Sequence, residues 1–459
     1  MPRLENSLKL LSKGYAWLPD ERRRAGRHAV GVRLGGMPAV GIEGPEAARF
    51  LYDEDHVRRS HAIPEPVQGT LFGKGAVHTL DGEMHRVRKA MFVALLMRED
   101  GIASLVERTT AAWDAAVPAW SRRSEIVLFD EASRVLAGSV ARWAGVPVRD
   151  GEVPELARDM VAMVDGFATG GPRHFRARRA RGRRERWLTQ LVRDVRSGQA
   201  EVEEGSAVDV VSRHRDADGT QLPADVAAVE LLNVIRPTTA VAWFVAFSGH
   251  ALIRWPGNRE KLASGDPAFA EAWAHEVRRF YPFAPFIGGR SPGRNEFAGE
   301  EIPENAMVLL DLYGQNHDPE LWDSPYAFHP ERFLGREIGE WELVPQGGGD
   351  PRTNHRCPGE QITVALLSAL AVRLARLQYE VPEQDAARPV SATWSSSCRG
   401  GLGRSTVGGT ARPQGEPVTS PPTPARDARA AAPVSADRAA SAPGGARRRA
   451  PRPAAAWPG

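Results

Sequence analysis

The chain has 459 residues, of which 42% are hydrophobic and 25% charged, and its formal net charge is +3. This length can bury a large core in one or two domains, and this composition is typical of a soluble globular protein. So small a net charge gives no support for nucleic acid or an acidic substrate as a partner, and we expect no nucleic-acid binding.

Helical periodicity dominates the chain, with a few short β-like segments between the helices. The patterns predict helices at residues 44–54, 84–97, 102–118, 129–143, 154–167, 173–197, 224–254, 268–280 and 360–377. They predict short strands at residues 28–34, 37–42, 125–128 and 307–311. Residues 286–345 are rich in Pro, Gly, Asn and Asp, which indicates turns. The expected fold class is therefore mainly α with small β-sheets.

The predicted helix at 173–197 begins with a very basic segment, Arg173 to Arg186. A solvated helix face is the expected structure, and a partner or nucleic-acid patch is the alternative. The predicted helix at 224–254 is the most apolar segment, but Glu230, Arg236 and Pro237 interrupt it. We therefore expect a buried core helix rather than a membrane span, and no stable membrane anchor.

Pro237 and Arg236 are unusual residues for the middle of an apolar helix. Pro237 lacks an N–H and should kink the helix, freeing the carbonyl of Asn233. Arg236 is a permanent cation, and a buried unpaired cation is costly, so it needs an anion. No acidic residue follows it within two turns, and Glu230 lies six residues before it, off its face. The missing anion is therefore expected to be a substrate carboxylate; a structural pair with a distant acid is the alternative.

Cys357 lies in a Gly-rich segment, residues 346–360, directly before the apolar helical run of residues 362–374. Backbone N–H groups and the helix dipole would favour a thiolate there. A thiolate is a good axial ligand for heme iron. The alternative is a small buried hydrophobic side chain. The chain's other cysteine, Cys398, leaves it without a disulfide framework, which favours a reducing, cytoplasmic location.

Two further motifs precede the cysteine in a characteristic order. Glu276 and Arg279 share a helix face at i,i+3 and can pair, and Phe328–Phe333 supplies Arg332 to the same cluster. The order Glu-x-x-Arg, Pro-Glu-Arg-Phe and a Gly-loop cysteine resembles the cytochrome P-450 family. The resemblance implies that fold, a structural Glu–Arg–Arg cluster, and heme b with its iron bound by Cys357.

The Arg236-Pro237 pair, residues 69–89 and the extended cysteine loop resemble one branch of that family, the bacterial fatty-acid peroxygenases. The resemblance covers residues 5 to 383. It implies that a fatty-acid carboxylate pairs with Arg236 and serves as acid–base for hydrogen peroxide. The expected products are α- or β-hydroxy acids, or terminal alkenes after decarboxylation, and no redox partner is required. Alternatives are a conventional redox-partner-dependent monooxygenase and a non-catalytic heme-thiolate binding protein.

The same resemblance assigns the remaining site residues. His78 would lie over the heme, where mainly hydroxylating members carry Gln and the alkene-forming member carries His. Phe72 would pack against His78, and Phe72 and Phe286 would contact the substrate together with Arg236. The heme propionates would be bound by His85, Lys89, Arg59, Arg290 and His355. The alternatives are a satisfied loop histidine for His78, core packing for Phe72, and solvated surface for the cations.

The composition changes near Asp385, and residues 385–459 consist largely of Ala, Pro, Arg, Ser and Gly. Such a segment cannot bury enough apolar surface to offset its ordering entropy. We therefore expect a heme domain at residues 1–384 and a disordered tail at 385–459. Members of the family usually continue after a segment like Tyr379–Pro382 into a β-hairpin that lines the pocket. No such hairpin pattern follows here.

Overall fold

The computed structural model describes residues 5–281 and 283–381. The longer helices are α5 (Gly82–Leu96), α6 (Glu99–Trp120), α7 (Leu128–Trp143), α8 (Val153–Asp165), α9 (Gly171–Arg196), α11 (Ala224–Thr239), α12 (Val241–Arg254), α14 (Pro267–Phe280) and α16 (Glu360–Arg376). The shorter ones are α1 (Ser7–Lys13), α2 (Trp17–Ala25), α3 (Pro45–Tyr52), α4 (Glu65–Val67), α10 (Ala207–Arg213), α13 (Asn258–Ser264) and α15 (Leu312–Asn316). Single helical turns form η1 (Gly14–Ala16), η2 (Gln68–Phe72), η3 (Val77–Thr79), η4 (Asp150–Glu152) and η5 (Pro330–Phe333).

The strands form one mixed sheet and one small hairpin. They are β1 (Ala29–Leu34), β2 (Met37–Ile42), β3 (Phe286–Arg290), β4 (Asn295–Phe297), β5 (Glu300–Ile302) and β6 (Met307–Asp311). The sheet has the order β1-β2-β6-β3, in which only β2 and β6 are parallel. Gly35 and Gly36 join β1 to β2 with φ of +57° and +77°, which favours glycine at both turn positions. The predicted class, mainly α with small β-sheets, is confirmed.

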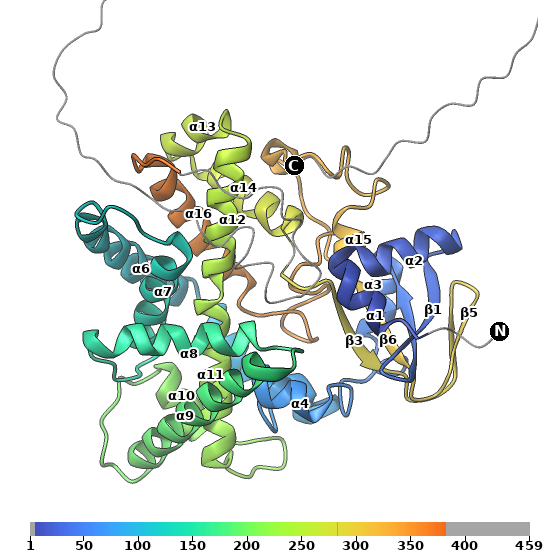
Figure 1. Ribbon diagram of the computed structural model, residues 1–459. Helices are drawn as coiled ribbons and strands as arrows, with labels where there is room; N and C mark the ends of the chain where they lie inside the picture. Colours follow the sequence, from blue (N-terminus) through green and yellow to red (C-terminus); the bar gives the residue numbers. More distant parts are fainter. Residues whose placement is uncertain (1–4, 282, 382–459) are drawn as a thin grey trace, which may run out of the picture. The chain divides into compact units, whose positions relative to one another are not determined.

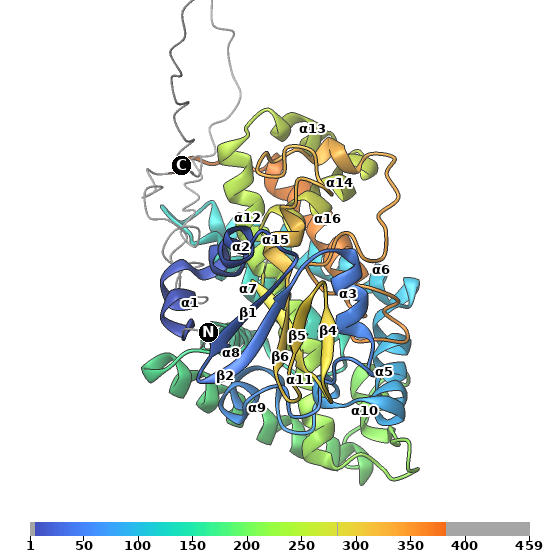
Figure 2. The same cartoon turned by 90° about the vertical axis from the view of Figure 1, so that its right-hand side faces the viewer.

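Most of the longer helices lie apart from the sheet, whereas α1, α2, α3 and α15 lie beside it (Figure 1). Figure 1 shows α6 to α12 on one side and the strands on the other, and Figure 2 shows the strands in front of the helices. The largest hydrophobic cluster joins helices α5 to α14 with α16, and a second cluster joins β1, β2 and β6 with α3. The segments that reach the candidate site come from both regions.

All the predicted helical segments are helical, the one at 224–254 as two helices, but the predicted strand at 125–128 is wrong. Leu128 is the first residue of α7, and Ile126, Leu128 and Phe129 are buried in the main cluster. The short apolar run therefore leads into a buried helix. A pattern of apolar residues over only four positions cannot distinguish the start of a buried helix from a strand. The turn-rich segment contains three strands that were not expected, β3, β4 and β5. Near the N-terminus, the polar helices α1 and α2 were not expected either.

The apolar run expected at 224–254 is two helices, α11 and α12, which separate at Ala240, three residues after Pro237. Among the described residues this run is the one long and apolar enough to cross a membrane, and 89% of its most apolar window is buried inside the protein. It forms the centre of the main hydrophobic cluster, as expected for a core helix. The predicted tail, from residue 385, lies outside the described residues, so the domain boundary stays a prediction.

Candidate active site

Cys357 lies in the loop before α16, with Gly359 as the residue that precedes the helix. Its backbone N–H donates to the Gln346 carbonyl at 3.0 Å, which closes the Gly-rich loop. Burial raises the pKa of the Cys357 thiol, while the charge of Lys89 and the Gly359 N–H act in the opposite direction. The charge of Lys89 and the Gly359 N–H therefore stabilise a thiolate, as expected. In the chain without a bound metal, the desolvation of the sulfur outweighs this stabilisation. A metal ion at the sulfur would reverse this balance, because a coordinating thiol loses its proton.

A buried polar network joins this loop to α14. The sequence motifs did not indicate it. Arg278, with none of its surface exposed, forms an ion pair with Glu360 and donates through Nε to Gln346 Oε1 at 3.0 Å. Arg356 donates to the other oxygen of Glu360 at 2.7 Å. The loop that carries Cys357 is thus held at both ends by charge-assisted hydrogen bonds. The sequence offered one indication of this network: Arg278 is adjacent to Arg279, and Glu360 is the first residue of the last helix.

The Glu–Arg–Arg residues lie together, as their motifs suggested. Arg279 donates from Nε and Nη2 to the two carboxylate oxygens of Glu276, both at 2.8 Å. Arg332, from η5, lies 3.2 Å from Glu276 Oε2. The side chains of Glu276 and Arg279 have no exposed surface. The cluster therefore joins α14 to the turn-rich segment ahead of the cysteine loop.

Arg236 is buried in α11, with 3% of its surface exposed. Its Nη1 donates to the Leu71 carbonyl and its Nη2 to Asn233 Oδ1 at 3.1 Å, while Nε has no hydrogen-bond partner. Burial, together with nearby Arg181, lowers the pKa of Arg236 to about 9, so the side chain stays charged at neutral pH. Within the described ranges no ion pair joins Arg236 to an acid, so the distant structural pair is not found there.

Glu230, the acid nearest before Arg236 in the sequence, is committed elsewhere. Its carboxylate pairs with Arg88 at 3.1 Å, accepts the Val77 N–H at 2.7 Å and accepts from Asn233 Nδ2 at 3.0 Å. Burial raises the pKa of Glu230, and these donors act against that rise. This arrangement agrees with the expectation that Glu230 lies off the face of Arg236.

Phe72 and His78 lie beside Arg236. The Phe72 and His78 rings are 4.8 Å apart, and the Arg236 guanidinium lies 6.0 Å from the Phe72 ring centroid. His78 Nδ1 is buried without a hydrogen-bond partner. Burial and the charge of Arg236 hold the pKa of His78 well below its usual value. His78 is therefore a neutral imidazole with one N–H, rather than a charged proton donor.

The residues assigned to the propionates come from α5, the cysteine loop and the edge of the sheet. His85 and His355 stack with ring centroids 3.8 Å apart, and Lys89 donates to the Arg356 carbonyl beside Cys357. Arg59 donates to the Gly288 carbonyl, and the backbone of Arg290 pairs with that of Arg58 at the edge of β3. Nitrogen atoms of His85 and Arg290 are buried without hydrogen-bond partners. Glu54, His85 and His355 also bring three possible metal-ligand atoms within 4.8 Å of one another.

This set of residues fits a heme. One free, half-buried thiol, Cys357, is available for iron, and the buried nitrogen atoms of His85 and Arg290 that have no hydrogen-bond partner are suited to the propionate groups. Phe286 is the first residue of β3, and its ring meets Trp17 with centroids 6.2 Å apart. Its contact with a substrate stays a prediction.

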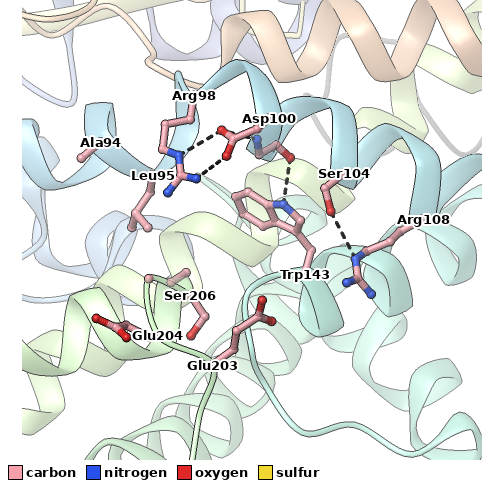
Figure 3. Close-up of a pocket in the computed structure, with 13 residues that line it drawn as sticks. Ala94, Leu95, Arg98, Asp100, Ser104, Arg108, Trp143, Glu203, Glu204 and Ser206 are labelled. Carbon is pink, nitrogen blue, oxygen red and sulfur yellow. Dashed lines mark hydrogen bonds and ion pairs between the residues drawn. The ribbon is translucent and has the colours of Figure 1, made fainter.

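A surface pocket of about 210 Å³ lies elsewhere, between α6, α7 and the segment before α10 (Figure 3). Arg98 pairs with Asp100 at its rim, and Trp143 donates to the Gly101 carbonyl at 2.9 Å. It contains none of the predicted site residues, and its polar lining does not suit an apolar chain.

Comparisons with known proteins agree with this geometry. Residues 268–400 match the family model for cytochrome P450. The ligand-free structure of cytochrome P450 OleT is similar with a TM-score of 0.84 and 36% identity, covering 88% of this chain and 97% of that one. A variant of cytochrome P450SP alpha (CYP152B1) gives 0.81 and 37% over the same shares, and cytochrome P450EX alpha (CYP152N1) with myristic acid gives 0.79 and 36% over 84% and 93%.

Curated relatives match over shorter segments. Carnosic acid synthase from Rosmarinus officinalis is 33% identical over 111 residues, and cytochrome P450 76C4 from Arabidopsis thaliana is 32% identical over 121 residues. These matches cover 23% and 25% of this chain, and the chain spans only 21% and 23% of those two proteins.

Proposed function

Because this chain belongs to the cytochrome P450 family, we propose that it is an oxidoreductase that uses hydrogen peroxide to hydroxylate fatty acids at the α or β carbon. Decarboxylation to a terminal alkene is a second outcome of the same reaction. A redox partner is not required. The similarity to P450EX alpha solved with myristic acid, and to OleT solved with arachidonic acid, supports a fatty acid as substrate.

The family's cofactor is a heme whose iron is bound by a cysteine. We assign the ligand to Cys357, the cysteine within the described residues, and the propionates to the cations and imidazoles around it. When bound, the heme supplies the iron that activates peroxide, and the thiolate donates electron density that favours O–O cleavage. The protein residues supply binding, orientation and proton handling.

Arg236 carries the proposal. A buried guanidinium that meets no acid in the described part of the chain is suited to a carboxylate that arrives with the ligand. Such a carboxylate, fixed beside the peroxide site, can accept and return a proton, a role worth roughly 10²–10⁴-fold in rate. Cα and Cβ of the substrate lie closest to the anchored group, and they are therefore the carbons expected to react.

The first test is turnover with peroxide alone. The purified protein is incubated with a panel of fatty acids and hydrogen peroxide, and the products are analysed by gas chromatography. We expect 2- and 3-hydroxy acids, with terminal alkenes among the products. Turnover that needs a reductase and ferredoxin instead of peroxide would favour the conventional monooxygenase. A heme whose spectrum responds to neither fatty acid nor peroxide would favour a non-catalytic binding protein.

A further inference from the structure

Arg181 is a second buried arginine at the same site, contributed by α9, which packs against α11 beside α4 (Figure 1). Only 2% of its surface is exposed, although it belongs to the most basic segment of the chain. Its Nε donates to Glu185 at 2.6 Å. Its Nη1 donates to the Leu71 carbonyl at 2.5 Å and its Nη2 to the Phe72 carbonyl at 3.0 Å. The basic segment is thus not only a solvated face.

Arg181 and Arg236 share an acceptor, and the hydrogen bonds between them close a ring. The Leu71 carbonyl accepts from Nη1 of both arginines. Arg236 Nη2 donates to Asn233 Oδ1, Asn233 Nδ2 donates to the Phe72 carbonyl at 3.1 Å, and that carbonyl also accepts from Arg181. Both lone pairs of each carbonyl oxygen are therefore used.

Within the ring, each Nη nitrogen of Arg236 donates one N–H. The other N–H groups of the Arg236 guanidinium are not used in the ring. An arginine has five N–H groups, so three remain, including the buried Nε that has no partner. The ring therefore fixes the plane of the guanidinium without occupying it. A carboxylate can then meet a donor pair whose direction is already set, which lowers the cost of binding.

Gly73 shows how closely Arg181 approaches this loop. Its φ is +90°, and a Cβ at this position would lie 2.1 Å from Arg181 Nη2. A side chain there would displace the guanidinium, and the positive φ itself favours glycine. The loop after Phe72 is therefore shaped so that Arg181 can reach both carbonyls.

We propose that Arg181 is a positioning residue for fatty-acid recognition: through the Leu71 and Phe72 carbonyls it fixes the orientation of the Arg236 guanidinium and of the Phe72 ring. This inference rests on the proposed function and adds to it the residue that aligns the anchor. Loss of Arg181 should reduce the preference for an acid over its ester, while binding of the alkyl chain is retained.

The test compares decanoate with methyl decanoate, titrated by calorimetry into the heme-loaded protein. Arg181→Met is expected to reduce the acid-to-ester affinity ratio about tenfold, equivalent to 1.4 kcal/mol, with ester affinity unchanged. Arg181→Lys should resemble Arg181→Met, because an ammonium keeps the charge but cannot donate as a planar fork to two carbonyls. The matched control is Arg196→Met, also on α9, which removes donors to the Ser212 and Leu222 carbonyls.

The outcomes separate the two proposals. Wild-type protein that binds acid and ester equally would overturn the anchoring function itself. Wild-type preference for the acid that survives in both Arg181 variants would overturn the positioning role alone. Full recovery of the preference in Arg181→Lys would also overturn it, since charge rather than orientation would then suffice. A ratio that falls equally in Arg196→Met would show a general packing effect and would count against the inference.

Discussion

Arg236 is held by a backbone carbonyl and a side-chain amide, and both leave its positive charge uncompensated. Arg236→Ala should therefore remove both the substrate anchor and the proton relay, reducing turnover with peroxide by roughly 10²–10⁴-fold. Arg236→Lys should restore little of this activity, because a lysine ammonium does not offer the paired donors of a guanidinium. Initial rates with one saturated fatty acid measure both effects. Full turnover by Arg236→Ala would contradict the anchoring role.

His78 is expected to influence which product forms. Its neutral imidazole lies next to Phe72 with Nδ1 buried and unpartnered, so a single N–H can be directed to the space beside the anchored carboxylate. His78→Gln should lower the alkene fraction relative to 2- and 3-hydroxy acids. Gas chromatography of the products from one fatty acid, under identical peroxide supply, measures the fraction. An alkene fraction that stays the same in the variant, or is zero in both proteins, would show that His78 does not direct the reaction.

Cys357 is the proposed iron ligand, and its replacement has a spectroscopic consequence. Cys357→Ser should abolish the red-shifted absorbance band that a thiolate ligand gives to the reduced carbon-monoxide complex, because serine oxygen is a weaker electron donor than thiolate. Cys398→Ser, outside the described residues, is the matched control and should keep the band. If Cys357→Ser kept it as well, the ligand assignment would be wrong.

At the scale of elements, α14 and the turn-rich segment are joined by one buried carboxylate. Glu276 serves Arg279 and Arg332 and also accepts the His329 N–H at 2.7 Å. Glu276→Gln would leave two buried guanidinium groups without a counter-charge, which typically costs about 3–5 kcal/mol. We expect a large fall in the thermal unfolding midpoint of the heme-loaded protein. The control is Glu46→Gln, whose partner Arg49 is exposed, where about 0–1 kcal/mol is expected.

The elements also show what a sequence can indicate and what it cannot. Long amphipathic runs such as those of α7 and α9 carry their own periodicity, so their existence could be predicted from the residues alone. β3 is a strand because its residues pair with those of β6, about twenty positions later in the chain. The composition of this turn-rich segment does not indicate that pairing. Arg181 reaches Leu71 across 110 positions and Arg278 reaches Gln346 across 68. Motifs indicated the proposed anchor and the proposed iron ligand, but not these long-range contacts.

Across the whole molecule, the helical region contributes the proposed anchor, and the sheet region contributes two of the residues assigned to the heme propionates. Arg236, His78 and Lys89 come from helices and turns of the larger cluster, while Arg59 and Arg290 lie at the edge of β3. The expected heme domain therefore needs both regions to be folded. The predicted tail, residues 385–459, lies outside the described residues.

We propose that a fatty-acid carboxylate, held by Arg236, takes part in its own oxidation. The most direct test follows peroxide-driven turnover of one saturated fatty acid beside its methyl ester, with no reductase present. We expect oxidation of the acid at the α and β carbons and negligible conversion of the ester, because the ester can neither pair with Arg236 nor move the proton. Equal conversion of acid and ester at the same carbons would contradict it.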